Sequence, residues 1–417
     1  MDDAVLREIN ERYFAAIVGG KARFFEDRQP LIGMDKQAFQ LTLAPIKVQV
    51  PTAKGGFEVK PAARLWEEWN GRRFYPDGFI LDPSGGHTDR AYNLWRGYGV
   101  EPVEGDVSLF REHLLLFDAH DYVWKWICWV IQNPADKPKV ALVFRGQEGV
   151  GKGLVGQVLL KIFGPHGLHV TQQRHVTGNF NAHLLTCCLL FADEADFTDK
   201  RDHGVLKTLI TEDRTPIEMK GVDVKEAESY VALLMSTNRN WVVPASVDAR
   251  RFVVVDVDNR HKNDHAYWAQ IWGWLENGGY GRILNAAMQE DVSDFSPMRD
   301  RVLTSALIDQ QLHSLTGVEK LLFQILWEGS HPGVIPTRWF VEQAKDEDKD
   351  VPMTLYHRLK DSGWVKENSH RPVGWRPPRD LALARRELFL SVDWPDDRTE
   401  WTIVDESEWR DRIEMPF

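Results

Sequence analysis

A run of sixteen residues, ALVFRGQEGVGKGLVG at 141–156, constrains the fold more than any other part of the chain. Four apolar residues typical of a strand lead into Gly146, Gly149, Gly151 and Lys152, and an apolar run typical of a helix follows. A glycine-rich turn at a helix N-terminus lets several backbone N–H groups point at one anion. The pattern therefore predicts a phosphate-binding loop in which Lys152 reaches the terminal phosphates of ATP.

The position after Lys152 departs from this pattern, which has Ser or Thr there as a ligand for Mg²⁺. The chain has Gly153 instead, so one direct ligand is lost. Because Mg²⁺ usually keeps several waters, a water can take the place of the hydroxyl. We therefore expect ATP and Mg²⁺ as cofactors, while a non-catalytic scaffold is an alternative that Gly153 leaves open.

Composition indicates a globular chain of 417 residues with 43% hydrophobic and 27% charged residues, long enough for two or three domains. No apolar run approaches the roughly 18 residues that span a bilayer, so no membrane partner is expected. Three cysteines and a charged N-terminus without a signal-peptide pattern favour a cytoplasmic location. The net charge of −11 argues against a general nucleic-acid binder but allows a local basic patch.

Strand and helix patterns alternate from 141 to 257 and predict an α/β core, with a parallel sheet flanked by helices. Two helices within 106–132 are expected to pack beneath the sheet. The aromatic run 265–279 predicts an amphipathic helix stopped by glycines. The core is placed at 101–303.

Residues 1–100 are predicted to form an α+β region of unknown role. Short β-like runs at 13–18, 38–43 and 47–50 alternate with turn signals, and a helical pattern lies near 61–70.

Polar residues follow two of the predicted core strands. Asp193 and Glu194 come after an apolar run, where Asp193 could hold Mg²⁺ and Glu194 could act as a general base on the attacking water. Asn238 ends another strand and could orient that water. A surface acidic turn and a turn-forming asparagine are the alternatives.

Arg250 and Arg251 precede the last core strand. An arginine suits a finger that reaches into the ATP site of a neighbouring subunit and stabilises the charge that develops in phosphoryl transfer. An ordinary salt bridge to Asp248 or Asp256 is the alternative.

The order of these elements over residues 91–257 resembles superfamily III helicases, the AAA+ ring ATPases of small viruses and phages. The likeness is greatest to the C-terminal helicase region of phage primase-helicases and primase-polymerases. The resemblance implies a homohexamer on single-stranded or forked DNA, encoded by a phage or prophage in a bacterial cell. It also implies phosphate binding by the loop through Gly153, Mg²⁺ at Asp193, water activation by Glu194, sensing by Asn238 and a finger at Arg250 or Arg251.

Such helicases carry a β-hairpin that lines the central pore and grips the DNA backbone. The corresponding segment here is TPIEMKGVDVKEAESY, with Lys220 and Lys225 on either side of the tip. Contacts to the backbone suit a motor because they carry no sequence information. A solvated hairpin is the alternative for each lysine.

Three helical patterns and a hairpin pattern at 304–390 outline a winged helix. Residues 357–379 hold six Lys or Arg against two acidic residues, with Trp364 and Trp375 among them. Arg371 and Arg376 are therefore candidate DNA contacts, and protein contacts are the alternative. Residues 391–417, with nine acidic and three basic residues, predict a loosely packed acidic tail.

Together these features predict an ATP hydrolase that acts as a DNA helicase or translocase. The alternative is an origin-binding or loader ATPase that uses ATP as an assembly switch without processive unwinding. There is no primase signature, and roughly 90 residues before the core are too few for the polymerase half of the resembling proteins. A separate primase or polymerase is therefore a possible partner.

Overall fold

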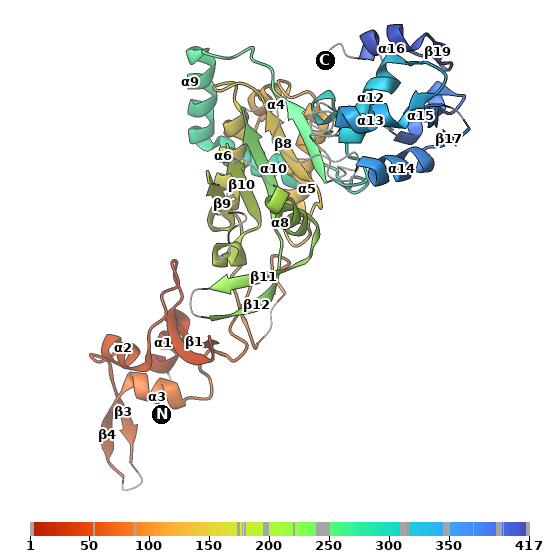
Figure 1. Ribbon diagram of the computed structural model, residues 1–417. Helices are drawn as coiled ribbons and strands as arrows, with labels where there is room; N and C mark the ends of the chain where they lie inside the picture. The colour runs from red at the N-terminus through yellow and green to blue at the C-terminus, as the bar shows by residue number, and fades with distance from the viewer. Residues whose placement is uncertain are drawn as a thin grey trace.

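The computed structural model arranges the chain as three units along an elongated molecule (Figure 1). The N-terminal region and the C-terminal helices lie at opposite ends, and a parallel sheet lies between them. The structure describes residues 4–52, 55–86, 89–172, 176, 178, 181–194, 200–219, 222–238, 251–308, 315, 317–344, 351–369, 371–388, 394 and 396–413. None of the helices within these residues is long and apolar enough to cross a membrane.

The N-terminal region combines helices with small sheets. Its helices are α1 (Ala4–Arg12), α2 (Lys36–Thr42) and α3 (Ala62–Glu68), and its strands are β1 (Tyr13–Val18), β2 (Lys21–Glu26), β3 (Lys47–Pro51), β4 (Phe57–Pro61), β5 (Phe74–Tyr75), β6 (Phe79–Ile80) and β7 (Tyr92–Asn93). The strand expected at 38–43 is wrong, because these residues belong mainly to α2. The Asp35 side chain caps this helix by accepting from the Ala38 N–H at 2.8 Å, and Phe39 is its buried residue.

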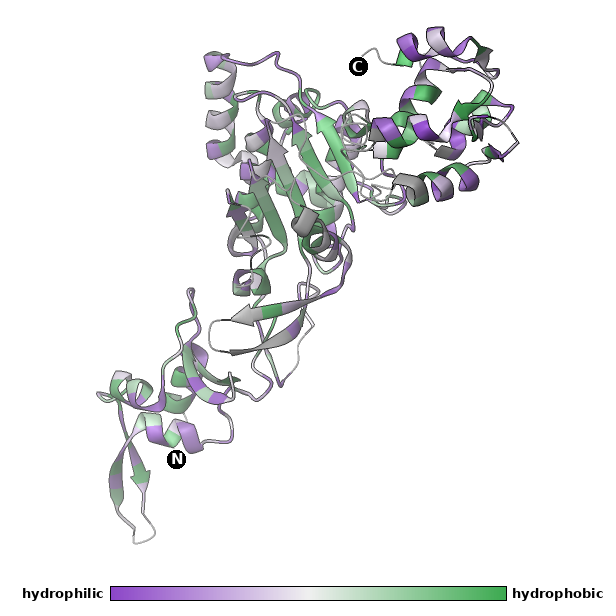
Figure 2. Ribbon diagram, viewed as in Figure 1, coloured by the Kyte–Doolittle hydropathy of each residue, from purple (hydrophilic) through white to green (hydrophobic). Residues whose placement is uncertain are grey.

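The central sheet has five parallel strands in the order β14-β8-β13-β10-β9. They are β8 (Ala141–Arg145), β9 (Gly167–Val170), β10 (Leu189–Asp193), β13 (Ala232–Thr237) and β14 (Phe252–Asp256). The central strands are buried on both faces and therefore appear in the sequence as continuous apolar runs, which Figure 2 shows as a green sheet. The predicted α/β core with a parallel sheet is confirmed.

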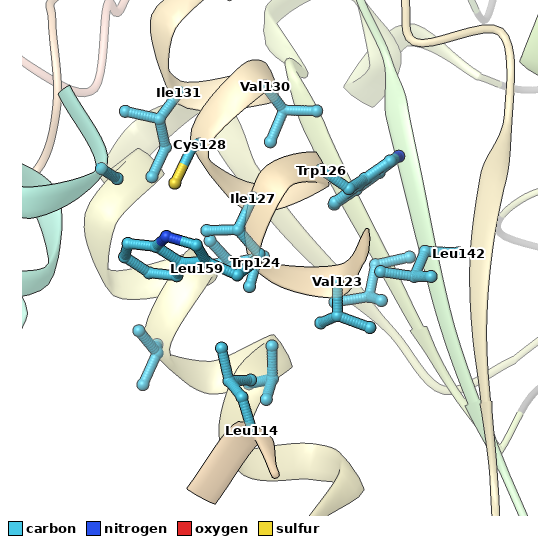
Figure 3. Packing of buried hydrophobic residues seen from close by; sticks show 14 of the residues in the cluster. Leu114, Val123, Trp124, Trp126, Ile127, Cys128, Val130, Ile131, Leu142 and Leu159 are labelled. Atoms are coloured by element: carbon cyan, nitrogen blue, oxygen red, sulfur yellow. The ribbon is translucent and has the colours of Figure 1, made fainter. Parts of the chain in front are cut away.

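Helices cover both faces of the sheet: α4 (Ser108–Leu114), α5 (His120–Gln132), α6 (Lys152–Phe163), α8 (Lys200–Thr211), α9 (His265–Trp274) and α10 (Tyr280–Gln289). Side chains alternate along each strand, so Leu142 of β8 packs in one hydrophobic cluster and Val143 in the other. The first cluster includes the inner faces of α5 and α6, where Ile127 and Leu159 lie close to each other (Figure 3). The second includes Leu209 of α8.

The helix predicted at 265–279 ends near its glycines, as expected. Asn277 and Gly278, the latter at φ +88°, leave the helical conformation, and a second helix, α10, follows them. Leu275 and Gly279 are buried at the junction. The predicted glycine stop is therefore confirmed, and α10 is a separate helix that packs against α5.

A hairpin of β11 (Arg214–Met219) and β12 (Val222–Glu228) lies between α8 and β13. It emerges from the side of the sheet nearest the N-terminal region (Figure 1). The backbone of Lys225 pairs with Ile217 in this hairpin, whereas Lys220 lies outside the described residues.

The C-terminal unit contains the expected helices α12 (Gly317–Glu328), α13 (Thr337–Ala344) and α14 (Val351–Asp361), together with α15 (Leu381–Leu388) and α16 (Glu406–Ile413). Its strands are β15 (Ser330–His331), β16 (Ile335–Pro336), β17 (Val365–Glu367), β18 (Gly374–Arg376) and β19 (Thr402–Ile403), and β16, β18 and β17 form one small sheet. The expected helices and hairpin are present, and the winged-helix assignment stays a prediction.

The acidic segment from 391 is not loosely packed over its described part. Trp409 of α16 is fully buried, and its ring centroid lies 4.7 Å from that of Trp339. The Trp409 indole N–H donates to the Ser330 carbonyl at 2.9 Å, and Asp396 pairs with the buried Arg385 at 2.9 Å. The prediction of a loosely packed tail was therefore wrong over these residues. It was based on the excess of acidic residues and did not consider the aromatic residues that pack this segment against the unit.

Candidate active site

The loop between β8 and α6 has the backbone that a phosphate-binding loop requires. Gly149 and Gly151 have φ values of +80° and +106°, in the left-handed region that favours glycine. The Gly146 N–H donates to the Thr237 carbonyl at 3.2 Å, which ties the start of the loop to the neighbouring strand β13. Gly149 and Gly151 therefore take the turn expected from the sequence, in a conformation that costs glycine no strain.

Lys152, the first residue of α6, directs its amine into this loop. Its Nζ donates to the carbonyls of Gly146 at 2.7 Å and Gln147 at 2.6 Å. Burial lowers the pKa of Lys152, while the charges of Glu194 and Asp193 oppose that shift. The carboxylates predicted to act with Lys152 therefore lie within electrostatic range of it.

The acidic pair lies at the same edge of the sheet as the loop. Asp193 is the last residue of β10, and Glu194 follows in the left-handed region at φ +56°, with its side chain exposed. The Glu194 N–H donates to the Ser236 carbonyl at 2.9 Å, and the Ser236 hydroxyl donates to Asp193 Oδ1. Since β13 alone separates β8 from β10, the pair lies on the order of 10 Å across the sheet from the loop strand, at about 4.8 Å per strand.

Asn238 follows the end of β13 directly and is exposed. It therefore leaves the sheet between the loop and the acidic pair, as the sequence predicted. Its role in orienting water stays a prediction.

Arg251 does not join this site within its own chain. Arg251 precedes β14, and its carbonyl accepts from the Ala141 N–H at 2.8 Å, at the edge of the sheet where β8 begins. The five residues of β14 separate it from the loop edge by about 17 Å, at about 3.3 Å per residue. Asp256 was one alternative partner for Arg250 and Arg251. It lies at the loop edge of the sheet and pairs there with Arg145 at 2.6 Å. Arg250 lies outside the described residues.

The basic segment 357–379 of the C-terminal unit makes contacts with its own chain. Arg376 pairs with Glu367 at 3.0 Å, and Arg371 Nη1 donates to the Asn368 carbonyl at 2.7 Å. Both arginines are exposed, whereas Trp364 and Trp375 are buried in the core of the unit. These tryptophans therefore stabilise the fold and offer no stacking surface.

Three residues at or near the candidate site were not predicted from the sequence. Ser236 bonds to Asp193, His169 Nε2 lies 3.8 Å from Asp193 Oδ2, and Arg145 forms a two-pronged pair with Asp256. Ser236 carried a signal, as a polar residue two positions before Asn238 at the end of an apolar strand. His169 and Arg145 carried none, because their neighbours come from distant segments.

The residues at this edge fit ATP and Mg²⁺. The loop offers backbone N–H groups and the Lys152 amine to phosphates, and Asp193 offers a carboxylate oxygen, the kind of ligand that Mg²⁺ prefers. A Cβ added at Gly153 would meet no atom within 4 Å, so nothing in the packing prevents a serine or threonine there.

Comparison with known proteins finds a family of unknown function and a phage replication protein that are similar to this chain. Residues 144–251 match the model of a family of unknown function, DUF5906. The chain is 26% identical over 314 residues to the DNA primase-polymerase of Nitratiruptor phage NrS-1. This match covers 66% of the chain and 42% of the relative, so the chain spans less than half of that protein.

Solved structures of the NrS-1 C-terminal region share the fold. One superposes with a TM-score of 0.62 at 15% identity and covers 93% of this chain and 90% of that one. Another superposes with a TM-score of 0.60 at 16% identity and covers 95% and 93%. The predicted likeness to the C-terminal region of a phage primase-polymerase is confirmed.

Proposed function

We propose that the chain is an ATP-dependent DNA helicase or translocase of the AAA+ superfamily III type, acting in phage or mobile-element replication. One observation carries the proposal. The phosphate-binding loop with Lys152 and the pair Asp193 and Glu194 lie at one edge of the sheet, on strands separated only by β13. Under this proposal, the loop and Lys152 would supply phosphate ligands, Asp193 a metal ligand and Glu194 a general base around one space.

Each residue has a role in hydrolysis under this proposal. The loop N–H groups and Lys152 bind the phosphates, which requires the Lys152 amine to exchange its bonds to Gly146 and Gln147 for phosphate oxygens. Asp193, oriented by the Ser236 hydroxyl, holds Mg²⁺ with a water in place of the missing hydroxyl. Glu194 accepts a proton from the attacking water, and Asn238 orients that water. Bound ATP supplies the phosphoryl group.

The position of Arg251 supports a site shared between subunits. Arg251 lies at the opposite edge of the sheet from its own loop, so it can reach phosphates only in a neighbouring copy. We propose that Arg250 or Arg251 completes the site of the next subunit in a ring, as a homohexamer requires.

A single helix connects the ATP site to the proposed DNA contact. Helix α8 begins six residues after Glu194 and leads into β11 of the hairpin. Its C-terminal end is fixed to the core by Lys137, whose Nζ donates to the carbonyls of Leu209 at 2.7 Å and Glu212 at 2.5 Å. The helix thus joins the segment after Glu194 to the hairpin, where Lys220 and Lys225 would grip the backbone of single-stranded or forked DNA.

A further set of DNA contacts and one further partner belong to the proposal. The exposed Arg371 and Arg376 would add DNA contacts from a winged-helix-like C-terminal unit. Because the match covers 42% of the phage primase-polymerase, the proposal for this chain does not include primer synthesis. A separate primase or polymerase in the bacterial cytoplasm would supply that activity.

The test is ATP turnover with Mg²⁺ and forked DNA, followed by displacement of a labelled strand. We expect turnover in the wild type, none in Lys152→Ala, and bound but unhydrolysed ATP in Glu194→Gln, which matches Glu194 in size. Turnover without strand displacement would favour the loader alternative. Turnover no higher than in Glu194→Gln would refute the proposed ATPase and leave the scaffold alternative.

A further inference from the structure

The last glycine of the phosphate-binding loop is enclosed by two helices that are distant in sequence. A Cβ added to Gly151 would lie 2.5 Å from His113 Cε1 and 2.7 Å from Trp268 Cη2. His113 comes from α4 and Trp268 from α9, so one helix from before the sheet and one from after it meet on this residue. Contacts this close exclude any side chain at position 151.

His113 makes a defined pair of polar contacts in this enclosure. Its side chain is fully buried, its Nε2 lies 3.3 Å from the Gly151 carbonyl oxygen, and its Nδ1 lies 2.8 Å from the Tyr267 hydroxyl. Because a carbonyl only accepts, Nε2 must carry the proton, and the lone pair on Nδ1 then accepts from the tyrosine. Burial lowers the pKa of His113 to about 4, which keeps this neutral form at pH 7.

The tyrosine is itself held in place. Its backbone N–H donates to Asp264 Oδ1 at 3.1 Å at the start of α9, and its ring stacks on His261 with centroids 3.8 Å apart. His261 Nδ1 bonds to the other carboxylate oxygen of Asp264 at 3.0 Å, and the Trp268 indole N–H donates to the His261 carbonyl at 2.9 Å. The Tyr267 hydroxyl therefore has little freedom to leave His113.

The direction of the Gly151 carbonyl decides where the next amide points. That carbonyl also accepts from the Leu154 N–H at 3.1 Å, in the first turn of α6. In a trans peptide the C=O and the following N–H point in opposite directions. Fixing the Gly151 carbonyl toward α6 and His113 thus turns the Lys152 N–H away from the helix, into the concave side of the loop.

We propose that His113, held by Tyr267, is a positioning residue that fixes the Gly151–Lys152 peptide so that its N–H faces a bound phosphate. The consequence for ATP binding rests on the proposed function, whereas the effect on the loop itself does not. A neutral hydrogen bond contributes about 1 kcal/mol, which corresponds to about fivefold in affinity.

The test uses the full chain and three variants. His113→Leu removes the bond to Gly151, His113→Gln keeps an N–H donor near the position of Nε2, and Tyr267→Phe frees the tautomer of His113 with minimal change in packing. Amide hydrogen exchange of the peptide that spans residues 146–156 is measured without nucleotide, and the affinities for ATP and adenosine are measured below the melting temperature.

We expect faster loop exchange in His113→Leu and Tyr267→Phe, wild-type exchange in His113→Gln, and about a fivefold loss of ATP affinity in the first two with no change for adenosine. Unchanged loop exchange in Tyr267→Phe and in a folded His113→Leu would overturn the inference. Equal losses for ATP and adenosine would overturn it too, since they would indicate a general packing role. If the wild type binds no ATP, the proposed function fails while the exchange measurement still decides the positioning role.

Discussion

Adding one methyl group at Gly151 or at Gly153 should have opposite effects on the core, although the two positions are only two residues apart. At Gly151, φ is +106° and the new Cβ would lie 2.5 Å from His113. At Gly153, the residue is helical and the new Cβ would meet nothing within 4 Å. Gly151→Ala and Gly153→Ala therefore form a matched pair that differs only in backbone conformation and surroundings.

The expected difference follows from these two environments. A side chain in the left-handed region costs about 1–2 kcal/mol, and forcing a methyl group into a packed site costs about 1–3 kcal/mol, so Gly151→Ala should lose about 2–5 kcal/mol. Replacing a helical glycine by alanine gains about 0.5–1 kcal/mol. For a unit of 150–250 residues, 1 kcal/mol shifts the melting temperature by about 2–4 °C.

The measurement is the melting temperature of the transition that contains the core, with ATP affinity measured at 20 °C. We expect a decrease on the order of 5–15 °C and loss of ATP binding for Gly151→Ala, against a small increase and retained binding for Gly153→Ala. Gly153→Ser should also fold, and its hydroxyl should lower the Mg²⁺ concentration needed for turnover. Equal melting temperatures for Gly151→Ala and Gly153→Ala would refute the assigned loop backbone and the enclosure by His113.

Three other perturbations test separate parts of the structure. Mixing inactive Arg251→Ala with inactive Lys152→Ala should restore part of the ATP turnover if the arginine acts across subunits, and no recovery at any ratio would speak against a shared site. Trp409→Ala should destabilise the C-terminal unit by about 3–5 kcal/mol while leaving ATP binding by the core unchanged, as calorimetry with and without ATP can show. The pKa of His113 is lowered to about 4 by burial and further by His261, so the unfolded chain binds a proton between pH 6.5 and 4 that the folded chain does not. The free energy of unfolding should therefore decrease as the pH falls from 6.5 to 4, and it should decrease more steeply in the wild type than in His113→Gln. Urea midpoints of the two proteins that change in parallel from pH 7 to 4.5 would contradict that pKa.

Local chemistry allowed much of the core to be predicted from the sequence. The strands that carry the loop and the acidic pair are buried on both faces, so they stand out as apolar runs of four to six residues that end in glycine or carboxylate residues. The prediction failed at 38–43, where Asp35 caps a short helix, and for the acidic segment from 391, where the buried Trp409 holds its described part on the C-terminal unit. In both places a contact outweighed the average preference of the residues.

The sequence by itself determined which residues could bind phosphate and metal, because a glycine-rich turn between a buried strand and a helix leaves the backbone few alternatives. Only the tertiary structure decided how these residues are combined. Strand order places β13 between β8 and β10, which brings Asp193 to Lys152 and sends Arg251 to the opposite edge. The packing of α4 and α9 also brings His113 and Tyr267, which are 154 residues apart, to one glycine of the loop. Such contacts depend on the order and packing of whole elements, which no local pattern of residues encodes.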